Sequence, residues 1–443
     1  MSGFFGPKFT AILISITILA FTFGVRHVTR SWTNPAVLYG LFWFSMTFLP
    51  LVALIDVPIY PGGVAFIALT VIAFSVPALL MARLWPASVA LSQARRDSSS
   101  LSGSRSLAVA FIVMQALTLC FVVINLQLQG FTIAEFAANP IAAANRYLMA
   151  RYDGLVSPNI FSQASVVLNY IAVAVGGILI VRVRGLVAQA AILVAAFLPS
   201  LVYMQVYADK GTLFLAAAYF FGALVASRVA AGDLRLMTRG TLISIFTCLV
   251  ILVPALVLTM AARNGSPNGP TDAIGKIMFY LRSYAFGHIY AFSDWFNHYL
   301  VGSSVMEYTD PAGNTWGYWS VMAVGEILWP EYELPDGYFT EYFFVSGVIQ
   351  TNVYTMFRGA IYDFGVSGIL IVMSLIGWAG AASYQRMLAT RHPVISQSFF
   401  IFLIGFLYTS FIFSLLTWTS IYAAAIGVTV VLFADRALSE GNS

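Results

Sequence analysis

Long uninterrupted apolar runs constrain this chain more than any other feature. A helix needs about 20 consecutive apolar residues to cross the hydrocarbon core of a bilayer. We expect such helices at 9–25, 34–54, 62–84, 107–129, 161–181, 185–206, 211–228, 240–262 and 364–383. A further apolar stretch, 397–435, is long enough for two helices with a turn near 417–420. The pattern predicts an all-α polytopic protein with about 11 transmembrane helices, in a range of about 10 to 12, forming a single integral membrane domain over 1–443.

The composition leaves lipid as the solvent of this chain. Hydrophobic residues make up 60% of its 443 residues and charged residues only 9%, whereas a soluble domain carries about 25% charged residues. The net charge of +4 does not point to an acidic partner, because the preference for basic cytoplasmic loops makes many membrane proteins basic. No nucleic-acid partner is expected.

Basic residues in the loops predict the orientation. With the N-terminus outside and the C-terminus inside, fourteen of the 22 lysines and arginines lie in cytoplasmic segments. The outer side then holds fourteen of the 18 acidic residues. The first helix is expected to be retained, because no small-residue cleavage site follows it. Two outer segments, 130–160 and 263–355, are too long for simple turns, and loops of this length are usually functional.

The basic residues left on the outer side are the strongest functional signal. The candidates for one anion-binding site are Arg146, Arg151, Lys210, Arg282 and Arg358. Lys210 and Arg358 each stand where a membrane helix begins at the outer boundary, so its N–H groups and positive dipole end face the same ligand. The planar fork of arginine suits phosphate oxygens. The alternatives are lysines and arginines that reach lipid headgroups, or simple ion pairs with neighbouring aspartates.

An aromatic segment gives the second signal. Residues 279–300 hold nine Phe, Tyr or Trp side chains in 22 positions. Such rings form belts at membrane interfaces, which is one interpretation. The other is a platform for sugar rings, with polar side chains between the rings to contact hydroxyl groups. Those polar residues are Arg282, His288, Asp294 and His298.

Metal and nucleotide chemistry are not indicated. The outer side has no Asp-x-Asp pair, and the nearest carboxylate pair, Glu331 and Glu333, is typical of a solvated loop edge. No glycine-rich phosphate loop is present. We therefore expect neither a metal nor a cofactor.

Four patches resemble one family. The sequence NVYTMFRGAIYDFG at 352–365 is similar to the signature that precedes a late helix in O-antigen polymerases, the Wzy-type oligosaccharide repeat-unit polymerases. YADKGTLFLAAAYFF at 207–221, GHIYAFSDWFNHYL at 287–300 and NPAVLYGLFWF at 34–44 also resemble segments of this family. Some members carry glycine eleven residues after an arginine. In this chain the positions eleven residues after Arg146, Arg151, Arg282 and Arg358 are not glycine. They hold Ser157, Ser162, Ser293 and Ile369, respectively.

The resemblance implies a reaction and a place. Such enzymes join undecaprenyl-pyrophosphate-linked oligosaccharide repeat units into O-antigen or a related surface polysaccharide, as in lipopolysaccharide biosynthesis. Transfer inverts the anomeric centre, and the lipid pyrophosphate leaves. The enzyme would be a metal-independent membrane glycosyltransferase of GT-C-like fold in the bacterial inner membrane, with its active site facing the periplasm. Its partners would be the lipid-linked donor and acceptor, the lipid bilayer and a co-polymerase that regulates chain length.

The implied reaction assigns a role to each of the candidate residues named above. The five outer cations would bind the pyrophosphate, with Arg358 also acting in catalysis, since preorganised cations stabilise the charge that grows on the leaving group. The acceptor hydroxyl needs a general base within hydrogen-bond reach. Asp294 is preferred and His288 comes next, with Glu326 and Asp363 as further candidates. The expected sugar-binding rings are Tyr284, Tyr290, Trp295 and Tyr354.

Two other functions remain open. An O-antigen ligase would move the finished chain onto the lipid A core and also uses a large outer loop. A flippase or transporter for lipid-linked oligosaccharides predicts charged residues deep in several helices, whereas the charges of this chain cluster at helix ends.

Overall fold

The computed structural model of the chain is almost entirely helical over the residues that it describes. These residues are 2–84, 105–183, 185–207, 209–236, 250, 270–328, 339–390 and 392–440. They form two compact units. The first unit comprises 1–88, 278–385 and 406–419, and the second comprises 89–277, 386–405 and 420–443. The single integral membrane domain stays a prediction.

The first unit contains three long N-terminal helices and the segments that surround the start of a fourth. Its elements are α1 (Ser2–Thr29), α2 (Pro35–Ala53), α3 (Pro61–Leu84), most of α12 (Pro270–Val301), α13 (Met322–Leu328), β1 (Phe343–Val345), β2 (Ile349–Thr351), most of α14 (Thr355–Ala389) and the short 3-10 helix η1 (Leu415–Thr417). The strands form an antiparallel hairpin in which Phe344 pairs with Gln350.

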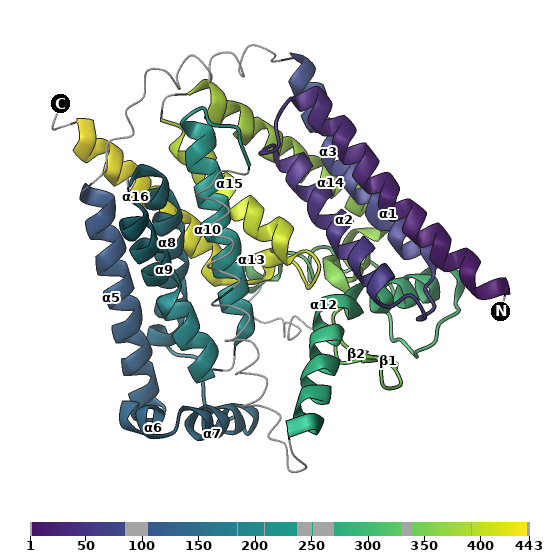
Figure 1. The fold of residues 1–443 in the computed structure, drawn as a ribbon, viewed down its shortest axis with the longest axis horizontal. Helices are drawn as coiled ribbons and strands as arrows, with labels where there is room; N and C mark the ends of the chain where they lie inside the picture. The colour runs from purple at the N-terminus through teal and green to yellow at the C-terminus, as the bar shows by residue number, and fades with distance from the viewer. Residues whose placement is uncertain are drawn as a thin grey trace. The chain divides into compact units, whose positions relative to one another are not determined.

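The second unit is a helical bundle with two short helices at one end. Its elements are α5 (Arg105–Leu128), α6 (Ile133–Ala138), α7 (Pro140–Tyr152), α8 (Ile160–Arg182), α9 (Leu186–Tyr207), α10 (Lys210–Ala230), most of α15 (Val394–Thr409) and α16 (Thr419–Glu440). Figure 1 shows α6 and α7 lying across the ends of α5, α8 and α9.

Within the described residues, nine helices are long and apolar enough to cross a membrane. They are α1, α2, α3, α5, α8, α9, α10, α14 and α16, and α15 is a shorter apolar helix. The protein is therefore an all-α, multi-pass membrane protein. The predicted break inside 397–435 is present, because α15 ends at Thr409 and α16 begins at Thr419. The predicted helix at 240–262 lies almost wholly outside the described residues.

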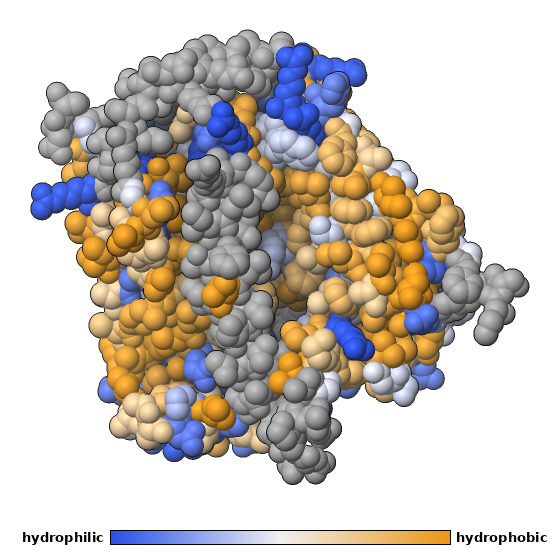
Figure 2. All heavy atoms as spheres, in the orientation of Figure 1, coloured by the Kyte–Doolittle hydropathy of each residue, from blue (hydrophilic) through white to orange (hydrophobic). Residues whose placement is uncertain are grey.

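The exposed faces of the long helices are apolar, as a lipid environment requires. Ile112 on α5 and Leu80 on α3 expose 65% and 57% of their surface. In each unit, Figure 2 shows apolar side chains along outward helix faces and polar side chains mostly near helix ends. A water-soluble protein rarely exposes contiguous apolar area of this extent.

The segments 130–160 and 263–355, which were predicted to lie outside, contain helices that the apolar runs did not predict. The first contains α6 and α7, and α7 begins at a proline behind Asn139, whose side chain accepts a hydrogen bond from the N–H of Ala142. Proline at the first helical position behind such a cap is a common start signal. The second contains the 32-residue helix α12. Polar residues interrupt the apolar pattern of α12, and it is not among the candidate membrane spans.

Close backbone contact and buried hydrogen bonds hold the first unit together. A Cβ added to Gly377 of α14 would lie 2.1 Å from the carbonyl oxygen of Phe74, so glycine lets α14 approach α3. The ammonium of Lys8 is buried and donates to the carbonyl of Leu54 at 2.8 Å and to the hydroxyl of Tyr290 at 2.7 Å. Lys8 therefore joins α1 to the end of α2 and to α12.

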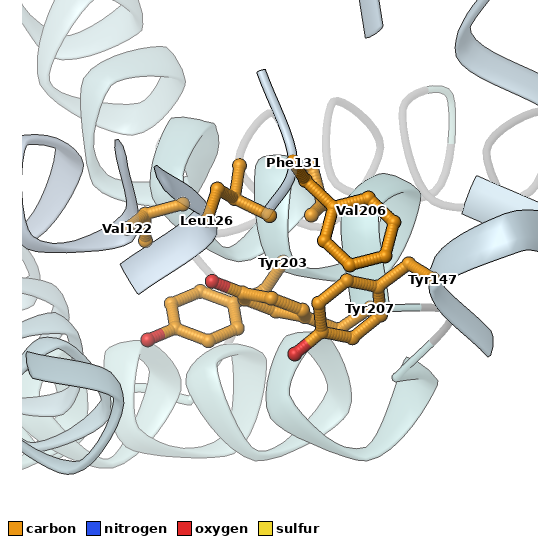
Figure 3. Packing of buried hydrophobic residues seen from close by; sticks show 7 residues of the cluster. All are labelled: Val122, Leu126, Phe131, Tyr147, Tyr203, Val206 and Tyr207. Carbon is orange, nitrogen blue, oxygen red and sulfur yellow. The ribbon is translucent and has the colours of Figure 1, made fainter. Parts of the chain in front are cut away.

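Aromatic packing fixes the end of the second unit at which α7 lies. Figure 3 shows the buried cluster, which consists of Val122, Leu126, Phe131, Tyr147, Tyr203, Val206 and Tyr207. The ring of Tyr147 lies 4.9 Å from that of Tyr207, centroid to centroid. The hydroxyl of Tyr207 accepts a hydrogen bond from the side chain of Asn125. These contacts hold α7 against α5 and α9.

Candidate functional site

The first ten residues of α14 form a distinct segment that carries most of the motif 352–365, which resembles the polymerase signature and is called the family-like motif below. Gly365 interrupts the helix with φ 70° and ψ 172°, a conformation that only glycine adopts without strain. Thr355 at the start also has a positive φ of 64°, which costs about 1–2 kcal/mol in a residue with a Cβ. Its hydroxyl accepts from the N–H of Phe357, and the N–H of Met356 donates to the carbonyl of Ser410. The segment is thus held by hydrogen bonds at its start and set off from the rest of α14 by Gly365.

Arg358 lies at the centre of this segment and is only 1% exposed. Its Nε donates to the hydroxyl of Tyr362 at 3.0 Å, and Nη2 donates to Oε1 of Glu341 at 3.0 Å. Its Nη1 is buried and has no hydrogen-bond partner within the described residues. A buried donor without a partner costs about 1–3 kcal/mol, so this nitrogen is a candidate contact for an acceptor group of a ligand.

Among the described residues, five aromatic rings surround the guanidinium of Arg358. Their centroids lie between 4.0 and 5.6 Å from its central carbon and belong to Phe339, Tyr354, Tyr308, Trp295 and Tyr362. The negative faces of such rings attract a cation. They replace part of the hydration that the buried charge has lost, while Glu341 supplies the balancing negative charge. We call Arg358, Glu341, these five rings, Asp310 and His298 the Arg358 cluster.

Asp310 occupies the polar end of the cluster. Its Oδ1 accepts from the hydroxyl of Tyr362 at 2.5 Å and from the indole N–H of Trp295 at 3.0 Å. Its Oδ2 lies 3.7 Å from Nε2 of His298. The hydroxyl of Tyr362 therefore joins the cation Arg358 to the carboxylate Asp310.

Asp294 holds the loop after α12, which carries Tyr308 and Asp310 of the cluster. Its two oxygens accept from the N–H groups of Val305 and Met306 and from the hydroxyl of Tyr308. Burial raises the pKa of Tyr308 above its ordinary range, so this phenol stays protonated and donates to Asp294. Burial also raises the pKa of Tyr354 to about 12, and its hydroxyl donates to the carbonyl of Glu341.

Asp363 anchors a second loop onto α14. It is fully buried and accepts from the hydroxyl of Thr315 at 2.6 Å and from the N–H groups of Trp319 and Ser320. The carbonyl of Asp363 also accepts from the N–H of Trp316. The aspartate of the family-like motif thus has a structural position, with four donors fixed to one residue.

The structure brings some of the predicted residues together. Arg358, Trp295 and Tyr354 share the cluster, and Asp294 reaches it through Tyr308. Asp294, the preferred base, already accepts three hydrogen bonds.

Other predicted residues on α12 lie apart from the cluster. Arg282 and Tyr284 are exposed, and Arg282 precedes Trp295 by thirteen residues, which is about 20 Å along a helix. His288 is buried with Nε2 3.0 Å from the carbonyl of Met46. Burial lowers the pKa of His288 to about 4, so it is neutral at pH 7. The hydroxyl of Tyr290 contacts the carbonyls at the end of α2. The side chain of Glu326 lies outside the described residues.

The remaining predicted cations belong to the second unit. Arg146 is exposed, pairs with Glu135 at 3.1 Å and lies over the ring of Phe131. Arg151 is exposed in the last turn of α7. Lys210 is half-buried in the first turn of α10, behind the capping side chain of Asp209. A pyrophosphate site that these cations share with Arg282 and Arg358 stays a prediction.

Sequence reasoning did not select Asp310, Tyr362 or Glu341, although all three contact Arg358 or its partner. Tyr362 follows Arg358 by four residues, which places both on one helix face, so this contact had a local signal. Asp310 and Glu341 come from distant loop positions and had none. Within the described residues, no group of three or more His, Cys, Asp or Glu side chains is arranged to hold a metal ion.

Comparison with known proteins adds no relative, since no protein-family model, curated protein or solved structure matches this chain.

Proposed function

We propose that this chain is a membrane glycosyltransferase of the O-antigen polymerase type. It joins undecaprenyl-pyrophosphate-linked oligosaccharide repeat units on the outer face of the bacterial inner membrane, with inversion at the anomeric carbon. The family-like motif 352–365 supports this proposal because it holds the central residues of the Arg358 cluster. The proposal extends to a GT-C-like fold and to chain-length control by a co-polymerase.

The observation that carries the proposal is the unpartnered Nη1 of Arg358 inside a cluster of rings and carboxylates. Arg358 lies in the first turn of α14, so the positive end of the helix dipole adds to its charge. A pyrophosphate leaving group gains negative charge as its bond to the sugar breaks. A fixed guanidinium that binds this charge stabilises the transition state.

Glu341 occupies the place that the pyrophosphate would take. Its carboxylate pairs with Arg358 at 3.0 Å and is 25% exposed, whereas Arg358 is 1% exposed. Phosphate oxygens can therefore replace the carboxylate oxygens of Glu341 from the solvent side. Glu341 keeps the buried cation neutralised between reaction cycles, because an unpaired buried charge costs several kcal/mol.

The test is polymer formation by the purified chain in liposomes with an undecaprenyl-pyrophosphate-linked repeat unit, followed as a ladder on a gel. We expect Arg358→Ala to lower the rate by about 10²–10³-fold. Arg358→Lys is measured as well, because it keeps the charge but loses the bidentate fork. Arg235→Ala is the control, since Arg235 is an exposed arginine in the segment after α10.

Three outcomes separate the possibilities. A wild-type ladder that Arg358→Ala reduces while melting temperature and membrane content stay comparable supports the proposal. A full ladder from both Arg358 variants contradicts the role of the guanidinium. In cells, deletion of a polymerase leaves one-repeat products, whereas deletion of a ligase leaves long chains on the carrier lipid.

A further inference from the structure

The solvent-facing end of the Arg358 cluster holds two groups that the binding of pyrophosphate leaves unused. His298 lies in the last turn of α12 and Asp310 in the loop that follows it. Their facing atoms, Nε2 and Oδ2, are 3.7 Å apart, and their side chains are 29% and 22% exposed. Both groups are therefore open to a ligand from solvent, unlike Arg358.

Hydrogen bonds around His298 indicate which ring nitrogen carries a proton. The hydroxyl of Ser304 donates to the carbonyl of Met306 at 2.5 Å and so has used its only hydrogen. The same oxygen lies 3.3 Å from Nδ1 of His298 and can act there only as an acceptor. Nδ1 of the neutral ring must then carry the hydrogen. Its Nε2 presents a lone pair toward Asp310.

Two acceptors thus face one another on the partly exposed side of the cluster. A lone pair and a carboxylate oxygen at this distance repel unless a donor lies between them or the ring is protonated. Oδ1 of Asp310 is fixed by Tyr362 and Trp295. Oδ2 is consequently held in a defined direction and can accept from one further donor. A hydroxyl group of a sugar is a donor of this kind.

Three candidate bases from the sequence, Asp294, Asp363 and His288, are less suited to receive a proton, and Glu341 is paired with Arg358. Asp294 accepts three hydrogen bonds from its loop. Asp363 and His288 are completely buried. Asp310 combines exposure with a second link, through the hydroxyl of Tyr362, to the cation that would hold the leaving group.

We propose that Asp310 is the general base for the acceptor hydroxyl and that His298 orients this hydroxyl. This inference rests on the proposed function. The acceptor oxygen forms a bond to the anomeric carbon of the donor, and the bond from that carbon to the pyrophosphate oxygen breaks with its electron pair remaining on the pyrophosphate. The proton of the acceptor hydroxyl passes to Oδ2 of Asp310 and from there to solvent.

Substitution of the base should separate catalysis from binding. Asp310→Asn keeps the size of the side chain but loses the basic oxygen, and we expect kcat for ladder formation to fall by about 10²–10⁴-fold, with the KM for the acceptor within about threefold. Asp310→Glu should recover part of the rate. His298→Gln should raise the KM more than it lowers kcat. The controls are Glu307→Gln, an exposed acid in the same loop, and His27→Gln, an exposed histidine on α1.

Binding of undecaprenyl pyrophosphate provides the second measurement. We expect the melting temperature of Asp310→Asn to rise on adding this lipid as much as that of the wild type, because the guanidinium of Arg358 is unchanged. A wild-type ladder that Asp310→Asn forms at full rate overturns the role of Asp310 and leaves the polymerase proposal standing. A wild type that forms no ladder overturns both. If Asp310→Asn and Asp310→Glu lose the lipid-dependent rise as well as the rate, Asp310 is structural and the inference is wrong.

Discussion

Tyr362 follows Arg358 by one helical turn and accepts a hydrogen bond from its Nε at 3.0 Å. The same hydroxyl donates to Asp310 at 2.5 Å. A single phenolic oxygen therefore contacts both the buried cation and a partly exposed carboxylate. Tyr362 is therefore the link between the cation that would hold the leaving group and the proposed base.

Removal of this hydroxyl is the first prediction. Tyr362→Phe leaves Nε of Arg358 without a partner and removes one of the two donors to Oδ1 of Asp310. We expect the free energy of unfolding to fall by about 1–3 kcal/mol and the polymerisation rate to fall with it. Thermal unfolding in detergent and the ladder assay measure the two effects. Tyr342→Phe, at a half-exposed tyrosine, is the matched control, and equal behaviour of the two variants would contradict the prediction.

The exchange of Glu341 for phosphate gives a second prediction. Glu341→Gln removes the negative charge that pairs with Arg358, so a pyrophosphate no longer competes with it. We expect the free protein to unfold at a lower temperature, because a buried cation loses its partner. The rise in melting temperature on adding undecaprenyl pyrophosphate should be larger than in the wild type. A smaller rise than in the wild type would show that Glu341 does not occupy the phosphate position.

Asp363 should be essential for structure rather than for proton transfer. Asp363→Ala leaves the N–H groups of Trp319 and Ser320 and the hydroxyl of Thr315 without their acceptor. Each buried donor left unpaired costs about 1–3 kcal/mol, so we expect a large loss of stability and faster proteolysis of 311–320. Asp56→Ala, at an exposed loop residue, is the control. Unchanged proteolysis in Asp363→Ala would argue against this anchoring role.

The buried His288 should make the stability of the folded protein depend on pH. Burial lowers its pKa to about 4 in the folded protein, while an unfolded histidine titrates near 6.5. Protonation therefore favours the unfolded state. The free energy of unfolding that the neutral His288 contributes is fully present above about pH 6.5. It is lost as the pH falls toward 4, with a slope of up to about 1.4 kcal/mol per pH unit. His288→Gln keeps a donor for Met46 but does not titrate, so its stability should vary less over this range. An equal slope in both proteins would contradict the assignment.

The helix pattern could be predicted because it depends on local chemistry. A run such as 107–129 has to form a helix in lipid, since every backbone polar group must be satisfied within the segment, and α5 covers 105–128. Asn139 and Pro140 likewise contain a local start signal for α7. The aromatic helix α12 also had a composition that indicated a special role, although not its full length of 32 residues.

The sequence by itself determined that this chain crosses a membrane many times, and it singled out Arg358, Trp295 and Tyr354. Only the tertiary structure decided which other residues contact these three side chains. Glu341 and Asp310 come from two separate loops and reach Arg358 and Tyr362 through long-range hydrogen bonds. Hydrophobic periodicity reports on a side chain's exposure to lipid over a few turns of helix. The pairing of charges depends on how the loops fold back, and no local pattern encodes that arrangement.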